Sequence, residues 1–208
     1  SAIVGDLLTI VRFDSRSEKL QMEPIALDEL MFDTLGRLNP VADRAGITVE
    51  PSCDELCFVS GDPVKLQQVI YNLVDNAIKF CGVGGEIRFS VTQSKGAVTV
   101  AVRNTGEGIA PEALPHVFDR FYKEDKSRGL NTSGAGLGLH ICKVLVNLSG
   151  GKIWADSKAG EYTEFLFTLP AGQKPQKRRE KGEKEKTGPE RLKGGPEDGA
   201  GADPADGQ

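Results

Sequence analysis

The chain has 208 residues, of which 26 are basic, 30 are acidic and 38% are hydrophobic, and its formal net charge is −4. This length allows one or two domains. No apolar run of about 18 residues occurs, which excludes a membrane-spanning helix from the sequence, and the first residues lack the basic and apolar regions of a secretory signal.

The predicted elements begin with helical spacing of apolar residues over 2–13, a piece that has no partner stripe and is typical of the end of a longer helix. Residues 20–27, interrupted by Pro24, predict an edge strand. Asp28 is predicted to cap a helix that ends at Gly46, and short strands are predicted over 47–49 and 57–59. The apolar positions of this helix are Leu30, Met31, Thr34, Leu35, Leu38 and Val41.

A second helix is predicted after Asp62, which caps it, with Pro63 in the first helical position. Glycines between 82 and 85 end this helix. Residues 86–93 and 97–102 alternate in the manner of strands and predict a hairpin. The buried stripe of the helix is predicted to consist of Leu66, Val69, Ile70, Leu73, Ala77 and Phe80.

The remaining elements complete a layered domain. About three helices on one face of a mixed sheet form a two-layer α/β sandwich. The apolar positions of the third helix are Leu137, Ile141, Leu145 and Leu148. In chain order, the remaining elements are a turn over 104–108, a short helical turn over 110–116, a mobile polar loop over 123–133, the third helix over 136–148, and strands over 152–155 and 164–169.

Residues 171–208 differ in composition from the rest of the chain. They include nine Lys or Arg, eight Asp or Glu, one aliphatic side chain larger than Ala (Leu192) and no aromatic side chain. Such a segment cannot bury enough apolar surface to offset the entropy lost on ordering, so it is predicted to be a disordered charged tail. Its basic cluster at 177–179 is flanked by acidic residues, which favours a solvated segment, and no nucleic-acid partner is expected.

The four cysteines lie in scattered apolar contexts, and the two histidines are far from them in the sequence. The spacing of Cys53 and Cys57 is that of half a zinc site, but no second pair of Cys or His completes it. We therefore expect no zinc site, and we expect Cys53, Cys57, Cys81 and Cys142 to be reduced, buried thiols of a cytosolic protein.

Four short motifs follow one another between residues 69 and 139, and their order is more informative than any one of them. Each is weak evidence by itself, because a G-x-G arises by chance in a chain with 25 glycines. Together they provide the parts needed to hold Mg-ATP under a lid. They are Asn72-Leu-Val-Asp-Asn76-Ala77, Asn104-Thr-Gly106-Glu-Gly108, Phe118-Asp-Arg-Phe121-Tyr122 and Gly134-Ala-Gly136-Leu-Gly138-Leu139.

The first motif places two amides on one face of the second helix. Asn72 and Asn76 are four residues apart, and Lys79 lies one turn further on. An amide oxygen is a suitable ligand for a Mg²⁺ ion that keeps most of its waters and its phosphates, and Lys79 adds a positive charge for phosphate. The alternative is a solvated polar face.

The glycine motifs provide backbone for a nucleotide. Gly106 and Gly108 let a planar base approach the chain, and Asn104 is placed to meet an exocyclic amine. Glycines at the start of the third helix leave free N–H groups for a phosphate, although they could also serve packing or capping. Phe118, Phe121 and Tyr122 are expected in the core and hinge rather than on the ligand. Lys123 could reach the terminal phosphate.

The four motifs resemble the N, G1, F and G2 boxes of the ATP-binding catalytic domain of bacterial sensor histidine kinases, members of the GHKL superfamily with gyrase and the large heat-shock chaperones. The resemblance covers roughly residues 20–170 and implies the Bergerat-type fold with ATP and Mg²⁺ as cofactors. It implies Asn76 as the metal ligand and Asn72, Lys79 and Lys123 as catalytic residues at the phosphates. The further nucleotide-binding residues that it implies are Asn104, Gly106, Gly108, Ile109, Phe118, Tyr122, Gly134, Gly136, Leu137, Gly138, Leu139 and Thr163.

Three positions depart from the family pattern. Asn104 stands where an aspartate is usual, Phe80 replaces a common tyrosine, and Tyr162 replaces the glycine that usually precedes Thr163. Three functions stay open: a histidine kinase, a GHKL ATPase that hydrolyses ATP, and a binding module without turnover. In the ATPase branch a glutamate general base stands at the position of Asn72, and an amide cannot take a proton, which favours phosphoryl transfer.

The resemblance also implies an arrangement of segments and partners. Residues 1–19 are expected to be the end of the second dimerisation helix and a linker, 20–170 the catalytic domain and 171–208 the tail. The expected partners are the phosphoacceptor helices of the same kinase, a second copy in a homodimer, and a response regulator. Neither His116 nor His140 has the sequence context of the phosphoacceptor. The expected location is the cytoplasmic part of a membrane-bound sensor.

Overall fold

The computed structural model describes residues 20–53, 57–123 and 136–173. All of them belong to one compact unit, residues 1–175. The predicted helical end over 2–13, the polar loop beyond Lys123, Gly134 and nearly all of the predicted tail lie outside the described residues.

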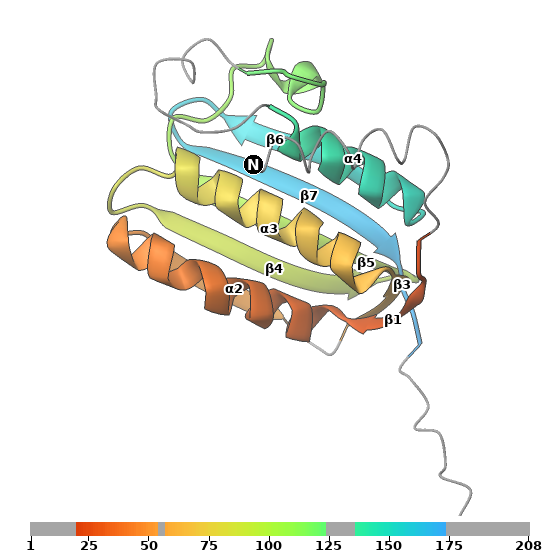
Figure 1. Cartoon of the computed structure of the whole chain (residues 1–208). Coiled ribbons are helices and arrows are strands. Elements are labelled where there is room, and N and C mark those ends of the chain that lie inside the picture. Colours follow the sequence, from red (N-terminus) through yellow and green to blue (C-terminus); the bar gives the residue numbers. More distant parts are fainter. Residues whose placement is uncertain (1–19, 54–56, 124–135, 174–208) are drawn as a thin grey trace, which may run out of the picture. The chain divides into compact units, whose positions relative to one another are not determined.

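A mixed sheet of five strands forms one layer of the domain, in the order β2-β4-β5-β7-β6 (Figure 1). β2 and β4 are parallel, and the other neighbours are antiparallel. A separate antiparallel pair is formed by β1 and β3. The strands are β1 Glu23–Ala26, β2 Thr48–Cys53, β3 Phe58–Gly61, β4 Glu86–Ser94, β5 Ala97–Thr105, β6 Lys152–Lys158 and β7 Tyr162–Pro170.

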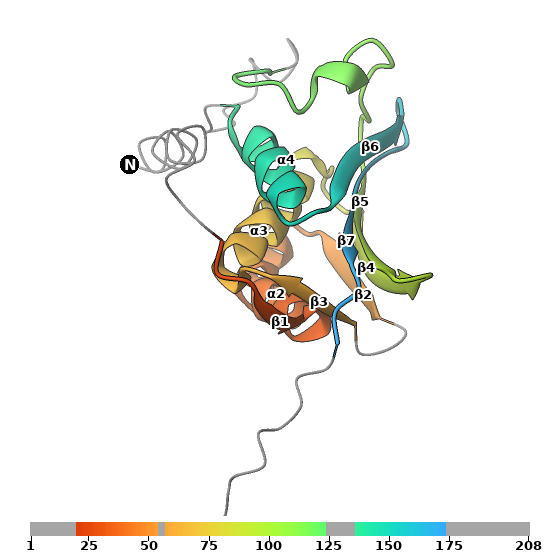
Figure 2. The same cartoon turned by 90° about the vertical axis from the view of Figure 1, so that its right-hand side faces the viewer.

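Three helices form the second layer, all on the same side of the sheet (Figure 2). No described element covers the opposite face, which we call the open face. This arrangement confirms the predicted two-layer α/β sandwich. The helices are α2 Leu27–Arg44, α3 Pro63–Phe80 and α4 Gly138–Leu148, and η1 Leu114–His116 is a single 3-10 turn.

The core lies between the two layers. Alternate residues of β4, β5 and β7 are buried, because successive side chains of a strand point to opposite faces of the sheet. The largest of these are the phenylalanines 89, 165 and 167, each at most 1% exposed. α3 contacts both α2 and α4, so the helix that carries the first motif is held on both sides.

The start of α3 is as predicted. Asp62 accepts hydrogen bonds from the backbone N–H groups of Val64 and Lys65, both at 3.1 Å, and Pro63 begins the helix. The predicted buried stripe is confirmed except at Phe80, which is 40% exposed. Phe80 is the last residue of the helix, and the chain is already extended at Cys81. In this final turn Ile78 takes the buried position, so Phe80 faces solvent.

The start of α2 differs from the prediction. The helix begins at Leu27, one residue before Asp28, and has no side-chain cap. The N–H of Leu27 donates to the carbonyl of Cys57 at 2.9 Å, so a contact with a distant strand sets the helix start. Asp28 lies in the first turn instead, where the helix dipole favours a negative charge.

Two predicted apolar positions are solvent-facing, Val41 at 40% and Leu148 at 50% exposed. In α2 the residue that follows Leu38 on the buried face is Ala42, four positions on, and not Val41, three positions on. A helix with 3.6 residues per turn allows either step. Two strands are longer than predicted, since β5 includes Asn104 and Thr105 and β6 continues to Lys158, whereas the strand predicted over 20–27 is shorter and covers Glu23–Ala26. No helix in the described part of the chain is long and apolar enough to cross a membrane.

None of the four cysteines forms a disulfide bond, as expected of reduced thiols. Cys57 and Cys142 are buried, but Cys53 and Cys81 are only half-buried, which corrects the prediction for these two. They lie at the last residue of β2 and directly after α3, at the ends of their elements. Within residues 20–53, 57–123 and 136–173, no cluster of three or more His, Cys, Asp or Glu could hold a metal ion.

Candidate nucleotide-binding site

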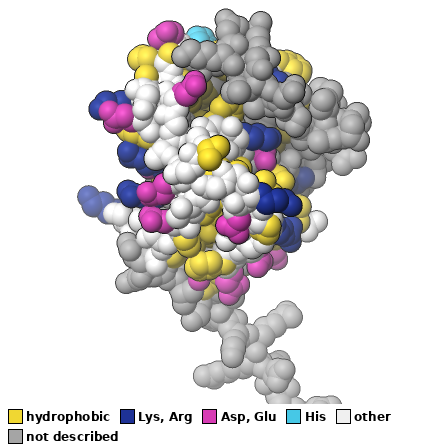
Figure 3. Space-filling view, turned by 90° about the vertical axis from the view of Figure 1, so that its left-hand side faces the viewer, with side chains coloured by type: hydrophobic (Ala, Val, Ile, Leu, Met, Phe, Trp, Pro, Cys, Tyr) yellow, Lys and Arg dark blue, Asp and Glu magenta, His cyan; other side chains and the backbone are white. Residues whose placement is uncertain are grey.

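α3 ends at one end of the sheet, at the left of Figure 1, and most of the predicted site residues belong to elements and turns that reach this end. The 106–109 turn after β5 and the turn between β6 and β7 lie at this end, and α4 begins beside α3. An isolated β-bridge joins Cys81, directly after α3, to Gly106. The first and second motifs are therefore adjacent in space. Figure 3 looks onto this end, where acidic and basic side chains are interspersed.

Asn104 and Thr163 form the innermost part of the site. They are register partners on β5 and β7, and they are only 2% and 5% exposed. Asn104 Nδ2 donates to the carbonyl of Thr105 at 3.0 Å. Because this bond uses the amide nitrogen, the orientation leaves Oδ1 as an acceptor. An acceptor at this position suits the exocyclic amine of adenine.

Ser157, on β6, was not predicted as a site residue. Its Oγ accepts from the N–H of Ile109 at 2.8 Å and donates to the carbonyl of Tyr162 at 2.6 Å. Since its only proton is used, the hydroxyl of Thr163, 3.3 Å away, is the donor between the two. Ser157 thus orders both Ile109 and Thr163. The predicted strand ended at 155, and extending its alternation by two residues would have indicated an inward Ser157.

Gly106 and Gly108 are needed where they stand. A Cβ on Gly106 would lie 2.4 Å from the carbonyl oxygen of Phe80, and one on Gly108 would lie 2.4 Å from that of Lys158. Their φ angles of +153° and +68° also disfavour a side chain. The turn is therefore packed directly against α3 on one side and the β6–β7 turn on the other.

Tyr162, which departs from the family pattern, does not obstruct the site. Its hydroxyl donates to Asp156 at 2.8 Å, and the guanidinium of Arg103 lies 3.6 Å from its ring centroid. Hydrogen bonding to Asp156 raises the pKa of Tyr162. Successive residues of a strand face opposite sides of the sheet, so Tyr162 lies on the open face and Thr163 on the helix side.

The amides of α3 reach toward α4. Asn72 Nδ2 donates to the carbonyl of Gly138 at 3.4 Å, which joins the first motif to the fourth. Asn76 is half-buried, and its side chain makes no hydrogen bond to any residue that the structure describes. Lys79 forms an ion pair with Asp75 at 2.5 Å, one helical turn away. This ion pair keeps the ammonium group of Lys79 close to α3, the helix that carries Asn72 and Asn76.

The start of α4 can receive an anion. Leu137 is the N-cap residue, is 1% exposed and provides no side-chain hydrogen bond to the helix. The first N–H groups of α4 therefore have no capping side chain, and such groups favour a phosphate. Leu139 is half-buried and packs against the core. Gly136 precedes the helix at φ +72°, and Gly134 lies outside the described residues.

The F turn, which we define as residues 118–122, has both buried and exposed rings. Phe118 is 8% exposed and contacts Phe165 edge-on, with centroids 6.0 Å apart. This confirms its expected place in the core. Phe121 is 61% exposed and has a positive φ of +61°, so it lies on the surface, which corrects its expected place in the core. Tyr122 and Lys123 are half-buried.

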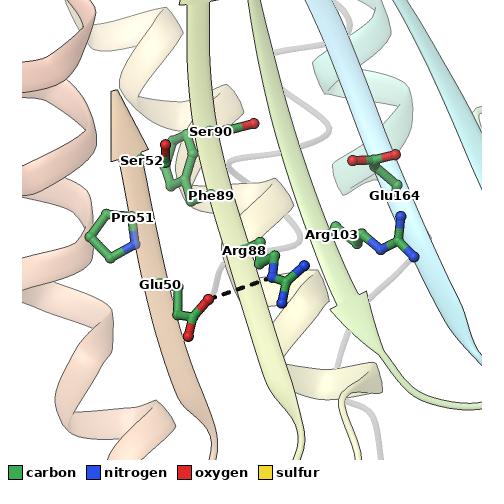
Figure 4. Close-up of a pocket in the computed structure, with 8 residues that line it drawn as sticks. All are labelled: Glu50, Pro51, Ser52, Arg88, Phe89, Ser90, Arg103 and Glu164. Atoms are coloured by element: carbon green, nitrogen blue, oxygen red, sulfur yellow. Dashed lines mark ion pairs between the residues drawn. The ribbon is translucent and has the colours of Figure 1, made fainter. Parts of the chain in front are cut away.

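A shallow hollow on the open face is separate from these residues (Figure 4). Arg88 and Arg103 lie directly opposite each other on β4 and β5, where like charges are unfavourable. Arg88 pairs with Glu86 and, at 3.5 Å, with Glu50, while Arg103 stacks on the ring of Tyr162. Both arginines are thus engaged, and none of the predicted nucleotide-binding residues lines the hollow.

Comparison with known proteins identifies the class. A family described as histidine kinase-, DNA gyrase B- and HSP90-like ATPases matches residues 61–173, more than half of the chain. The chain belongs to this family.

Two sensor proteins are similar to it in sequence. Sensor histidine kinase WalK of Bacillus subtilis is 35% identical over 170 residues, which are 81% of this chain and 28% of WalK. The sensor protein SrrB of Staphylococcus aureus is 35% identical over 172 residues, which are 81% of this chain and 29% of SrrB. The chain thus spans less than a third of the length of these relatives.

Solved structures place the likeness in the catalytic domain. The nucleotide-free catalytic domain of histidine kinase ThkA matches with a TM-score of 0.65 and 28% identity, over 72% of this chain and 95% of that domain. Full-length ShkA in complex with AMPPNP matches with a TM-score of 0.74 and 27% identity, over 84% of this chain and 36% of ShkA. The fold is that of histidine kinase catalytic domains.

Proposed function

We propose that this domain binds Mg-ATP and is the catalytic domain of a sensor histidine kinase, which transfers the γ-phosphoryl group to a histidine on dimerisation helices. One observation carries the proposal. The amide of Asn104 is buried, faces Thr163 and keeps an acceptor oxygen beside two glycines that let a base approach closely. Thr163 is already paired with Ser157, so the side-chain oxygen of Asn104 is the group of this pair that remains available to a ligand.

The proposed base-binding residues are Asn104, Thr163, Gly106, Gly108 and Ile109. Oδ1 of Asn104 would accept from the adenine amine. The backbone of the 106–109 turn would lie against the ring, held in place by Ser157. The AMPPNP bound to ShkA is an ATP analogue, which supports the same nucleotide class for this chain.

The proposed phosphate-binding residues are Asn72, Lys79, Lys123 and the start of α4 from Gly136 to Leu139. Asn72 holds α3 and α4 together through Gly138, and Lys79 contributes a positive charge. Phe118 and Tyr122 would anchor the chain beside the phosphates. Gly134, outside the described residues, is proposed here only by resemblance.

Asn76 is the proposed metal ligand. Its amide has no partner among the described residues, and a single neutral oxygen fits a Mg²⁺ ion that keeps water and phosphate oxygens as its other ligands. When bound, the ion would neutralise charge on the phosphates. The protein's own part is then positioning and charge stabilisation, since phosphoryl transfer requires little covalent work.

Asn72 favours transfer over hydrolysis. An amide cannot act as a general base, and Nδ2 of Asn72 is already directed to Gly138. In the proposed whole protein, a homodimer with its catalytic domains in the cytoplasm would phosphorylate its own helices and then a response regulator. A binding module without turnover is the second candidate, and the departure at Asn104 is what favours it.

The test is transfer to an added acceptor. The chain is incubated with γ-labelled ATP, Mg²⁺ and the separately produced dimerisation hairpin of the same kinase. We expect acid-labile label on the hairpin, none on the chain, and little release of inorganic phosphate without the hairpin. Nucleotide binding without labelling would support the binding module, and stable label on His116 or His140 would contradict the proposal.

A further inference from the structure

His140 connects helix α4 to the F turn. It lies in the first turn of α4, and its ring contacts two residues of the F turn at once. Nδ1 is 3.0 Å from the carbonyl oxygen of Phe118, and Nε2 is 2.9 Å from Nε of Arg120. A side chain at the start of the proposed phosphate-binding helix thus spans to the segment that leads into Lys123.

The partners determine where the imidazole carries its proton. A guanidinium group only donates hydrogen bonds, so Nε2 must accept from Arg120 and carries no proton. A neutral ring then has its proton on Nδ1, which donates to the carbonyl of Phe118. Both contacts are made only by the neutral form, since a protonated ring would present a second donor to the guanidinium.

The two hydrogen bonds of His140 belong to a continuous set of contacts. The N–H of Phe121 donates to the carbonyl of Gly136 at 3.1 Å, and Phe121 itself has a backbone conformation that side chains disfavour. The turn therefore depends on contacts from outside to keep its shape. On the other side of α4, Gly138 accepts from Asn72, so the F turn, α4 and α3 are joined in series.

The other charged group of the F turn, Asp119, has a different partner. Asp119 pairs with His116 at 2.9 Å, and both side chains are more than half exposed. Arg120 is thus the charged group of this turn that faces His140. With both ring nitrogens engaged, His140 is unsuited to accept a phosphoryl group, and its role is to hold the turn.

We propose that His140 is a positioning residue for phosphate binding. Its neutral ring acts through Arg120 and the carbonyl of Phe118 and holds the F turn against α4. Lys123 and the free N–H groups of the helix can then bind the same phosphates. This inference rests on the proposed function. It predicts an effect on the phosphates of the nucleotide and none on the base.

The experiment compares ATP with adenosine. Affinities are measured by calorimetric titration with Mg²⁺ for the parent chain, His140→Leu and His140→Gln. The side-chain oxygen of glutamine reaches about as far from Cβ as Nε2 and can accept from Arg120, but no group of glutamine stands at the position of Nδ1, so glutamine keeps one of the two contacts. We expect His140→Leu to weaken the affinity for ATP about tenfold (about 1.4 kcal/mol) and that for adenosine less than about twofold, with His140→Gln between the parent and His140→Leu.

Two further variants make the result specific. His116→Leu removes the other histidine near this turn and should change neither ligand. Arg120→Leu removes the same contact from an exposed position and should lower the affinity for ATP as much as His140→Leu does. In the double variant, the second substitution should cause little further loss of affinity. If His140→Leu does not fold, Arg120→Leu and His140→Gln still decide the matter.

The outcomes separate this inference from the proposed function. A parent that binds neither ligand contradicts the proposed function. A parent that binds both, with variants that weaken ATP and adenosine equally or not at all, contradicts the role of His140 alone. Additive losses in the double variant also contradict it, because they would mean that the two side chains do not act through each other.

Discussion

At the scale of single residues, Asn104 is held by a bond that an aspartate could not make. Its Nδ2 donates to the carbonyl of Thr105, and the opposite oxygen is left for a ligand. A carboxylate at this position would direct one oxygen at that carbonyl. The substitution Asn104→Asp therefore has two opposing consequences, one for the empty domain and one for the complex.

We expect Asn104→Asp to bind ATP more tightly and to be less stable without it. A charged acceptor makes a stronger bond to the adenine amine, worth about 1 kcal/mol, or on the order of fivefold in affinity. The lost bond to Thr105 lowers the free energy of unfolding by about 1–2 kcal/mol. Calorimetry with ATP and GTP, together with urea denaturation, measures both. Equal affinity of the parent for ATP and GTP would mean that Asn104 does not read the base.

Cys142 shows how burial controls a side chain beneath the site. Burial raises the pKa of its thiol to about 12, partly opposed by hydrogen bonding with Asn72. The folded protein thus keeps the thiol neutral over a range in which the unfolded chain ionises it. Above the unfolded pKa the unfolded state binds fewer protons, so this group makes stability fall as pH rises.

We expect Cys142→Ala to flatten the alkaline part of the stability profile. Between about pH 9 and pH 12 the free energy of unfolding of the parent should fall more steeply than that of the variant, by up to about 1.4 kcal/mol per pH unit. Urea denaturation across this range measures the difference. Parallel profiles would show that Cys142 does not contribute, and Cys81→Ala, at a half-buried position, is the matched control.

At the scale of elements, Asp62 joins two segments at the start of α3. One carboxylate oxygen caps the helix, and the other accepts from the N–H of Gln21 at 3.1 Å. Asp62 is 7% exposed, so neither set of donors would be replaced fully by water. The chain that enters the domain at 20–21 is thus tied to the helix that carries Asn72 and Asn76.

We expect Asp62→Ala to lower the free energy of unfolding by about 2 kcal/mol, at the upper end for an N-cap because the Gln21 N–H also loses its acceptor. Asp62→Asn keeps one oxygen for the cap and loses the contact with Gln21, so its loss should be smaller. Urea denaturation of the three proteins measures this order. An asparagine variant as unstable as the alanine variant would contradict the role of the cap.

Local signals made α3 predictable, whereas contacts between distant segments caused the errors in the predicted ends of other elements. Asp62, Pro63 and a strong apolar stripe lie within one helix, so propensity and burial agree there. The start of α2 depends on the carbonyl of Cys57, about 30 residues away, which no local pattern encodes. The extent of β5 through Asn104 likewise depends on pairing with β7. Element types were therefore predicted, and several of their ends were not.

The candidate site was predictable as a set of motifs and not as a set of contacts. Glycine spacing and paired amides indicated a nucleotide, since those residue types suit base and phosphate. The contributions of Ser157 and His140 arise because β6 and the F turn come next to residues far away in the chain. Their roles consist of hydrogen bonds to backbone groups and to the side chains of Thr163 and Arg120, and a sequence does not state which of these groups will be near.

At the scale of the whole domain, the proposed site has two ends built on different layers. The proposed base end lies on β5, β6 and β7 and contains Asn104, Thr163 and Ser157. The proposed phosphate end lies on α3 and α4 and contains Asn72, His140 and the start of α4. Since Asn76 belongs only to the helices, the metal ion should matter for phosphates and not for the base.

We expect chelation of Mg²⁺ and the substitution Asn76→Ala to have the same selective effect. Either should weaken ATP at least about tenfold, which corresponds to about 1.4 kcal/mol, and leave adenosine within about twofold. Their effects should not add, because a protein without its amide ligand has little metal-dependent affinity left to lose. Titrations of both proteins with ATP and adenosine, with Mg²⁺ or with a chelator, measure this. An equal loss for adenosine would mean that Asn76 supports the fold of the site instead, and a full additional loss on chelation would mean that another group holds the ion.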